Sequence, residues 1–481
     1  MVSASDGRML NLRRHGNAVA VIMDDGVAID HRGLSDRCDD WAAQIDGRSV
    51  VFILSDNTLP ALIGLVACLE HGIVFLVLDA RIDERHLLGM IRAYEPDYLW
   101  RPSAGGGYAL ERLNRTPGGG ERLAPHPELA MLLATSGSTG SPKVVRIGRE
   151  NVLANVHNHI SILGLRPDDR YLALLPFDHT YGLSMLLSHL YAGASVLISG
   201  KTVMERGFWD FLEAAAATVI GGVPCTYELF DRLMFFERDF PALRLLTLAG
   251  GKPSDELHVK LSEYADRTGK RFIAMYGQSE ATALIAYLPS EFALRKIGAI
   301  GVPIAGGETW LVDEDGKTVL EAGKSGELMF SGPTVSLGYA TDRSGLARGD
   351  ERHGVLATGD LAKRDSDGCY YIVGRKSRFL KVCGHRVDLD AVERMVAGMF
   401  PGVECACTGE DDRVCVFFTG DCAGKSIVDF VSRSVNLPEG AFSAARIAAI
   451  PRSSSGKILY GALAQAGKVA SAMSEGGQAN G

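Results

Sequence analysis

Residues 49–79 read SVVFILSDNTLPALIGLVACLEHGIVFLVLD, and this stretch decides the fold. The apolar run at 49–54 predicts a buried strand, and the run at 59–72 predicts a helix that ends at Gly72. A second apolar run at 73–79 predicts the next strand. Two strands joined by a helix in this way form a βαβ unit, in which the strands are parallel.

The same alternation continues as far as FIAMYG at 272–277. It predicts a doubly wound α/β architecture, in which ligands bind at loops beyond the carboxyl ends of the strands. Loops that contain glycine do follow apolar runs at such places. They occur in LAMLLATSGSTG (129–140), LRLLTLAGG (243–251) and FIAMYGQSE (272–280).

The composition excludes several classes of protein. The 481 residues carry a formal net charge of −8 without a dense lysine or arginine stripe, which argues against nucleic acid as a partner. No apolar stretch is long enough to span a membrane, and the amino-terminal residues lack the apolar core of a secretory signal. The nine cysteines include no C-x-x-C pair. We therefore expect a cytoplasmic protein with reduced thiols.

After residue 300 the pattern changes to strands separated by turn residues, and a smaller unit of strands and helices begins near 376. We expect a large N-terminal domain of doubly wound sheets with a β-rich subdomain over residues 1–375. A small α+β C-terminal domain is expected over 376–467. The last residues, 468–481, are expected to be a disordered tail.

The loop TSGSTGSPK (135–143) has the ingredients of a phosphate site. It is not a P-loop, because Gly137 and Gly140 are too close together and Lys143 does not directly follow a glycine. Its glycines allow close backbone approach, its hydroxyls can donate hydrogen bonds, and its lysine supplies a point charge. The composition alone fits a surface turn equally well.

The stretch MYGQSEAT (275–282) places an aromatic residue and a carboxylate at a strand end. Tyr276 could stack on a base, and Glu280 could hold Mg²⁺ that bridges phosphates. The ordinary alternative is a helix start, in which Glu280 favours the helix dipole.

Two later stretches carry further candidates. Asp360, in LATGDLA (356–362), could accept ribose hydroxyls, and Arg375 follows the strand-like YYIVG. Lys457 stands in PRSSSGKIL (451–459). Turn chemistry and a solvated surface lysine are the ordinary alternatives.

Together with SGELMFSGPTVSLGYA (325–340) and KVCGHRVDLDAVE (381–393), these stretches resemble, in order, the core motifs of the adenylate-forming superfamily. This superfamily includes acyl-CoA synthetases, adenylation domains, luciferases and D-alanine–carrier-protein ligases. The resemblance extends to residues 55–80, so that it covers nearly the whole chain. It implies the adenylate-forming enzyme fold, with ATP and Mg²⁺ bound.

The resemblance also implies roles for individual residues. Catalytic roles fall to Lys457, Glu280 and His179, with Glu280 as the Mg²⁺ ligand and Lys457 as the group that stabilises charge during attack on the α-phosphate. Ser279 stands where the family usually has threonine and keeps the hydroxyl. The implied nucleotide-binding residues are Thr135, Ser136, Gly137, Ser138, Thr139, Gly140, Lys143, Gly250, Gly251, Tyr276, Gly277, Gln278, Ser279, Asp360, Ile372 and Arg375.

The family reaction has two halves. A carboxylic acid and ATP first give an acyl-adenylate and pyrophosphate, and a thiol of CoA or of the phosphopantetheine of an acyl carrier protein then attacks the adenylate. Between the halves the C-terminal domain rotates and withdraws Lys457. The family hinge is commonly Asp or Lys, but Ser377 stands at that position here, so Lys376 and Ser377 are both candidates for the pivot.

The stretch LPFDHTYGL (175–183) bears on the acid. Asp178 could pair with the ammonium of an amino acid, but the pattern H-x-Y-G-L resembles acyl-CoA synthetases and favours an acid without an α-amino group. The pocket candidates are His179, Tyr181, Val223, Pro224 and Gly250, each of which could equally be a packing residue.

Three alternatives stay open at this point. The acceptor could be an amine, the acid could be an amino acid, or the chain could be a nucleotide-binding paralogue without catalysis. Retention of Lys143, Glu280, Asp360 and Lys457 argues against the last of these.

Overall fold

The computed structural model describes residues 8–113, 123–134, 143–382, 385–410, 412–453, 456 and 458–464. The chain forms two compact units. The first comprises Met1–Thr309 and Met329–Leu356, and the second comprises Trp310–Leu328 and Ala357–Gly481. The domain boundary between residues 375 and 376 stays a prediction.

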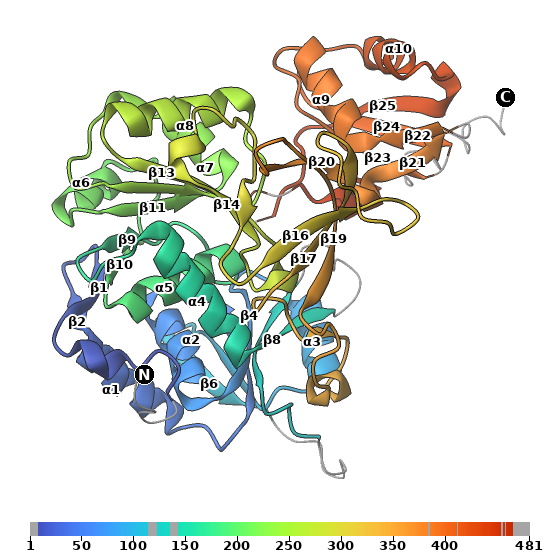
Figure 1. Cartoon of the computed structure of the whole chain (residues 1–481). Helices are drawn as coiled ribbons and strands as arrows, with labels where there is room; N and C mark the ends of the chain where they lie inside the picture. The colour runs from blue at the N-terminus through green and yellow to red at the C-terminus, as the bar shows by residue number, and fades with distance from the viewer. Residues whose placement is uncertain are drawn as a thin grey trace. The chain divides into compact units, whose positions relative to one another are not determined.

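The first unit contains two large mixed sheets (Figure 1). The centre of each sheet is parallel, and antiparallel strands lie at both edges. The nine-stranded sheet has the order β15 (Val302–Pro303), β14 (Ala286–Leu288), β13 (Arg271–Tyr276), β12 (Leu245–Leu248), β11 (Val219–Gly222), β9 (Arg170–Leu172), β10 (Ser195–Ile198), β1 (Val19–Met23) and β2 (Ala28–Asp30). The seven-stranded sheet has the order β18 (Gly338–Ala340), β8 (Val144–Gly148), β7 (Leu129–Ala134), β4 (Val74–Asp79), β3 (Val50–Ser55), β5 (Tyr98–Pro102) and β6 (Tyr108–Arg112).

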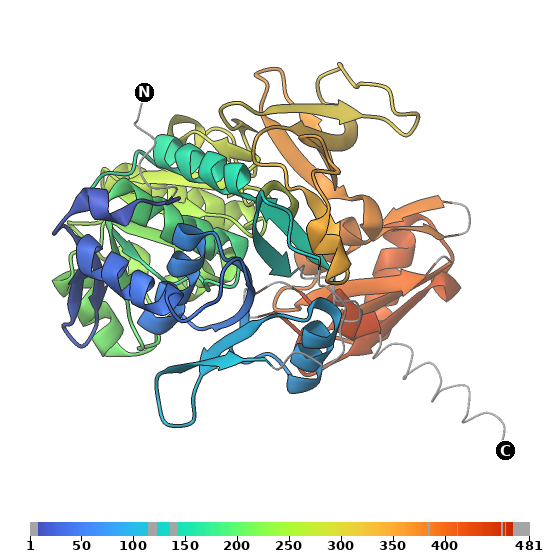
Figure 2. The same cartoon turned by 90° about the horizontal axis from the view of Figure 1, so that it is seen from below.

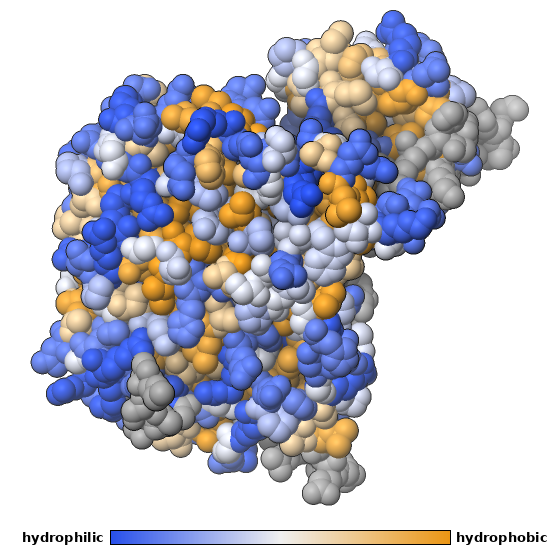
Figure 3. Space-filling model, in the orientation of Figure 1, coloured by the Kyte–Doolittle hydropathy of each residue, from blue (hydrophilic) through white to orange (hydrophobic). Residues whose placement is uncertain are grey.

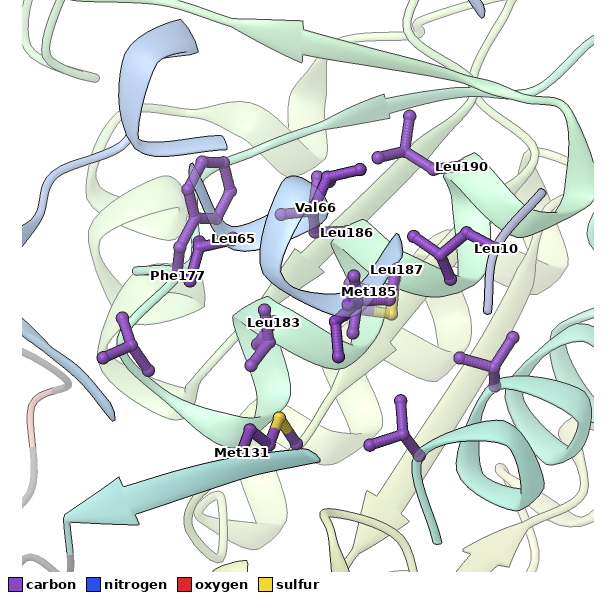
Figure 4. Close-up of a cluster of buried hydrophobic side chains, with 14 of the residues drawn as sticks. Leu10, Leu65, Val66, Met131, Phe177, Leu183, Met185, Leu186, Leu187 and Leu190 are labelled. Atoms are coloured by element: carbon purple, nitrogen blue, oxygen red, sulfur yellow. The ribbon is translucent and has the colours of Figure 1, made fainter. Parts of the chain in front are cut away.

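Helices cover and separate these sheets. Their bounds are α1 (His31–Ala42), α2 (Leu59–His71), α3 (Glu84–Tyr94), α4 (Arg149–Leu163), α5 (Thr180–Ala192), α6 (Arg206–Ala214), α7 (Pro224–Arg232) and α8 (Asp255–Arg267). One hydrophobic core contains residues of α2, of α5 and of both sheets. Figure 4 shows the apolar side chains of α2 and α5 pointing toward one another, with Met131 of β7 beside them. Helix α1 packs against α2 (Figures 1 and 2).

The predicted βαβ unit is confirmed. Strands β3 and β4 are parallel, and α2 between them ends at Gly72, whose φ of 68° lies in the left-handed region that favours glycine. Alternate side chains of β3 enter two different cores: Val51 and Ile53 face the core with α2, and Phe52 faces the core with α3. Burial on both faces explains why the strand reads as one continuous apolar run.

The second unit contains the expected mixture of strands and helices. A four-stranded sheet has the order β16 (Glu308–Val312), β17 (Ser325–Ser331), β19 (Val355–Arg364) and β20 (Tyr370–Arg375), and some of its residues belong to the first unit. The elements that follow are β21 (Phe379–Val382), β22 (His385–Asp388), α9 (Leu389–Met399), β23 (Cys405–Glu410), β24 (Arg413–Phe418), α10 (Gly424–Val435) and β25 (Phe442–Arg446). The predicted hairpin β23–β24 is confirmed, and β25 adds to it in parallel.

The surface and the helices give no sign of a membrane-spanning segment. Within the described ranges, no helix is both long enough and apolar enough to cross a bilayer. The face in Figure 3 is dominated by hydrophilic residues with apolar ones interspersed.

Arg146 is the largest fully buried side chain of the described residues. It lies on β8, and its guanidinium donates to the carbonyl oxygens of Leu337 (3.0 Å), Tyr339 (3.1 Å) and Gly349 (3.0 Å) and pairs with Glu351. One charged group therefore fixes the path of residues 337–351 beside β8.

We expect the Arg146→Met substitution to lower the free energy of unfolding by about 2–4 kcal/mol, because it leaves several carbonyl oxygens without a donor. Urea unfolding followed by circular dichroism measures this. Arg348→Met is the matched control, since its exposed guanidinium also pairs with Glu351 and the loss of such a pair costs less than about 1 kcal/mol. Equal losses in the two variants would contradict this assignment.

Candidate functional site

The predicted phosphate-binding loop connects β7 to β8. It follows a strand, as expected, but leads into an antiparallel strand and not into a helix. This connection distinguishes it from a P-loop, which opens a helix. Thr135, Ser136, Gly137, Ser138, Thr139 and Gly140 lie outside the described residues, whereas Lys143 is described and directly precedes β8.

Lys143 and Glu280 meet at one tyrosine. The Nζ atom of Lys143 lies 3.5 Å from the ring centroid of Tyr339, and the Tyr339 hydroxyl donates to Oε1 of Glu280 at 2.7 Å. Strand β18 carries Tyr339 into this place by pairing with β8, opposite Val145. Three segments distant in sequence thus bring an ammonium group and a carboxylate to opposite ends of one aromatic side chain.

The Tyr339 hydroxyl is a permanent donor at neutral pH. Burial raises the pKa of Tyr339 to about 12, and the neighbouring Glu280 adds to the rise. The guanidinium of Arg352 also faces the ring, at 4.8 Å from its centroid. The cluster therefore combines two cations, one fixed hydroxyl and one carboxylate, which is a set of groups suited to phosphate and to a hard metal ion.

The carboxyl ends of three adjacent parallel strands, β11, β12 and β13, carry most of the other predicted residues of this unit. Tyr276 ends β13, and Gly277 follows at a point where a Cβ atom would lie 1.4 Å from the carbonyl oxygen of Ala283. No side chain fits there, so the glycine is required by the turn. Ser279 Oγ lies 3.2 Å from Thr180 Oγ1 at the start of α5.

The pocket candidates lie beside these residues. A Cβ atom on Gly250 would lie 3.0 Å from Cγ1 of Val223, and one on Gly251 would lie 3.3 Å from Cγ of Pro224. The hydroxyl of Tyr181 is 2.6 Å from Oγ1 of Thr247 on β12. The structure thus brings together Tyr181, Val223, Pro224, Gly250 and Gly251 at the carboxyl ends of β11 and β12.

His179 directly precedes α5, and its Nε2 atom lies 3.8 Å from Oδ2 of Asp178. Burial raises the pKa of Asp178 to about 6, the nearby Asp79 adds to the rise, and Arg81 opposes it. A buried carboxyl group with this pKa is partly protonated near neutral pH.

The second unit brings together the two residues predicted to contact ribose and phosphate. Asp360 and Arg375 are register partners on β19 and β20, and Nε of Arg375 donates to Oδ1 of Asp360 at 2.8 Å. The Asp360 side chain is 5% exposed and that of Arg375 is 62% exposed, so a buried carboxylate holds an exposed guanidinium. Ile372 is half-buried on β20.

Of the two hinge candidates, Lys376 is bound through Nζ to Oε2 of Glu327 at 2.7 Å. The side chain of Ser377 and the whole of Lys457 lie outside the described residues. In the part of the chain that the structure describes, no group of three or more histidine, cysteine, aspartate or glutamate residues could hold a metal ion.

Comparison with known proteins decides the family. The family model of AMP-binding enzymes matches residues 10–340. The chain belongs to this family.

Among curated relatives, a 2-succinylbenzoate–CoA ligase of Bacillus cytotoxicus is 26% identical over 392 residues, covering 79% of this chain and 80% of the relative. A feruloyl-CoA synthase of Amycolatopsis is 30% identical over 372 residues, covering 72% of each chain. The AMP complex of the O-succinylbenzoate coenzyme A synthetase of Bacillus subtilis has a TM-score of 0.77 at 21% identity, covering 95% of this chain and 98% of that one. This last likeness shows the fold.

The AMP-binding family confirms the resemblance drawn from the motifs, and the adenylate-forming enzyme fold is confirmed with it. The chain is an AMP-forming acid–thiol ligase. The roles of its individual residues stay predictions.

The sequence analysis missed two residues of this AMP-binding site. Thr247 had a signal, because it is the single polar residue of the apolar strand β12. Tyr339 stands within a recognised motif, but its contact with Glu280 spans 59 residues, and nothing local to either residue indicates the pairing.

The pKa of Asp178 makes a prediction about pH. The folded chain keeps this proton up to about pH 6, whereas an unfolded chain loses it near 3.8, so raising the pH between these values favours unfolding. We expect the wild type to lose up to about 3 kcal/mol of stability across this interval relative to Asp178→Asn. Urea unfolding from pH 4 to 7 measures the difference.

The control is Asp210→Asn, which removes an exposed carboxylate on α6. Its stability profile should run parallel to that of the wild type. A parallel profile for Asp178→Asn as well would show that Asp178 titrates normally.

Proposed function

We propose that this AMP-binding enzyme activates a carboxylic acid without an α-amino group, using MgATP, and transfers the acyl group to the thiol of CoA. The observation that carries the proposal is the cluster of Lys143, Tyr339 and Glu280 in a chain of this family. The names of the relatives support CoA as the acceptor, since they are CoA ligases and synthases. Those names also make aromatic acids the first substrates to test.

The nucleotide would lie at the carboxyl ends of β11, β12 and β13, as ligands do in open α/β sheets. Tyr276 would stack on adenine, with Gly250 and Gly251 opposite, and Gly277, Gln278 and Ser279 would line the same turn. In the second unit, Asp360 would accept the ribose hydroxyls. Arg375, held by Asp360, would contact a phosphate, and Ile372 would pack nearby.

The phosphates would be bound by residues 135–143. Lys143 is held at the ring of Tyr339, which fixes a positive charge at the end of this loop. Glu280 fits a Mg²⁺ ion, because Mg²⁺ takes one or two carboxylates together with substrate phosphates, and no larger ligand group occurs among the described residues. Bound Mg²⁺ would neutralise charge on the phosphates that leave as pyrophosphate.

Lys457 would stabilise the charge that develops on the α-phosphate as the acid attacks. Residues 376–467 would form the mobile domain that carries it, with Lys376 or Ser377 as the pivot and 468–481 as a tail. The ion pair of Lys376 with Glu327 would have to break or shift if residue 376 turns. The acid itself would be bound by His179, Tyr181, Val223, Pro224 and Gly250.

One prediction separates metal binding from nucleotide binding. Tyr339→Phe keeps the ring for Lys143 but removes the hydrogen bond to Glu280, so we expect the Kd for MgATP to rise about tenfold. The Kd for ATP in the presence of EDTA should stay unchanged. Isothermal titration calorimetry measures both values.

Tyr339→Leu also removes the ring, and a further loss of about threefold should then appear with and without the metal. Equal losses for ATP and MgATP in Tyr339→Phe would remove Tyr339 from the metal site.

A pyrophosphate-release panel tests the reaction itself. The acids should include aromatic, fatty and short polar acids and amino acids, and the acceptors should include CoA, a holo-carrier protein and amines. We expect pyrophosphate release with an acid that lacks an α-amino group, and an acyl-CoA product. Lys457→Ala should slow acid-dependent pyrophosphate exchange by about 100-fold or more.

Other outcomes favour the alternatives. Amide products would indicate an amine acceptor, and activity confined to amino acids would place Asp178 opposite an ammonium group. ATP binding without AMP from any acid would indicate a non-catalytic paralogue. Unchanged exchange in Lys457→Ala would overturn the role given to that lysine.

A further inference from the structure

In the second unit, two side chains bind the backbone of the edge strand β23. The N–H group of Cys407 donates to Oε1 of Glu393 at 2.6 Å, and Nη1 of Arg378 donates to the Cys407 carbonyl oxygen at 2.7 Å. Cys407 is buried, so these backbone groups need partners. The edge of the sheet is therefore closed by Glu393 of α9 and by Arg378, which follows β20.

Arg378 is the centre of this contact. It is 9% exposed, its Nε atom donates to Oδ1 of Asp390 at 2.7 Å, and Nη2 pairs with Glu393. Burial acts to lower the pKa of Arg378, but the Glu393 carboxylate more than offsets it, and the pKa is raised. The guanidinium is thus a fully committed, charged anchor.

Tyr460 completes the group from the carboxyl-terminal end of the described chain. The Cζ atom of Arg378 lies 3.8 Å from the centroid of the Tyr460 ring, and the Tyr460 hydroxyl donates to Oε2 of Glu393 at 3.1 Å. Burial raises the pKa of Tyr460, and Glu393 adds to the rise, so the phenol remains protonated. We call Arg378, Glu393 and Tyr460 the Tyr460 clamp.

The clamp holds the stem of a closed loop. Arg452 and Ile458 form an antiparallel bridge, and the N–H group of Leu459 donates to the Pro451 carbonyl oxygen at 2.8 Å. Nη1 of Arg452 also donates to the carbonyl oxygen of Gly456 at 2.7 Å. The segment 451–459 is therefore closed upon itself, and its second arm leads straight into Tyr460.

Both ends of the clamp lie close in sequence to functional positions. Lys457 stands three residues before Tyr460, and Arg378 stands two residues after the hinge candidate Lys376. The clamp consequently joins the segment that follows the hinge to the segment that carries the lysine, and Glu393 of α9 lies between them.

We propose that Tyr460 is a positioning residue for Lys457: the clamp ties the loop 451–459 to the segment after the hinge, so that the lysine moves with this lobe as one body. This inference rests on the proposed function, in which Lys457 serves the adenylation half of the reaction. Without the clamp the loop stem would be held by its own bridge and by apolar packing of Ile458 and Leu463. The lysine would then be presented to the α-phosphate for a smaller fraction of the time.

The two half-reactions provide the test. We expect Tyr460→Phe, which removes one hydrogen bond to a carboxylate, to slow acid-dependent pyrophosphate exchange about 3- to 10-fold. Tyr460→Leu, which also removes the ring from Arg378, should slow it about 10- to 100-fold. Thiolysis by CoA of acyl-adenylate supplied from outside should stay at the wild-type rate in both variants, because it does not use Lys457.

Tyr371→Phe is the matched control. Its hydroxyl donates to Asp365 at 3.2 Å in a turn after β19, away from the clamp. This variant should run both half-reactions at the wild-type rate. Equal slowing of exchange and thiolysis in Tyr460→Leu would indicate general damage to the lobe and overturn the proposal, as would no slowing of either.

A second measurement does not depend on catalysis. Hydrogen–deuterium exchange of the full chain should show faster exchange in residues 451–459 of Tyr460→Leu, by about tenfold, with β24 still protected. Unchanged exchange there would overturn the clamp. If the wild type activates no acid but this loop loosens, the clamp stands as an anchor and the proposed function is what fails.

Discussion

Burial of the central parallel strands on both faces is the constraint on which the first unit depends. Strand β3 sends alternate side chains into two separate cores, so no polar group is tolerated along it. Polar chemistry is thereby displaced to the strand ends. The consequence is visible at β11, β12 and β13, whose carboxyl ends carry Val223, Gly250 and Tyr276.

The sequence predicts most of what is local. Apolar runs of strand and helix length located β3, α2 and β4, and Gly72 marked the end of α2 because few other residues adopt its φ. Ordered motifs likewise located Glu280, Asp360 and Arg375. What they share is that the signal and the structure lie within a few residues of each other.

Long-range contacts escaped prediction for the opposite reason. Strand β1 pairs with β10, Arg146 binds carbonyl groups about 190 residues or more away, and Tyr339 meets Glu280 only because β18 pairs with β8. Such pairings are chosen by the whole fold and not by the propensity of either partner. The arginine at 146 even reads as a flaw in an apolar strand, and only the loop it binds explains its burial.

The two units handle their charged groups in different ways, and the difference fits the proposed chemistry. In the first unit, Lys143 and Glu280 are joined through Tyr339, which lies on a strand of a seven-stranded sheet, so their spacing is fixed by the sheet. In the second, the loop that carries Lys457 has only a bridge and a clamp. Groups that hold leaving phosphates gain from a rigid frame throughout the reaction. A lysine required in one half-reaction and withdrawn in the other needs a mount that is firm within its lobe, while the lobe itself turns at a hinge. A clamp that joins the lysine loop to the segment beyond the hinge meets both requirements at once.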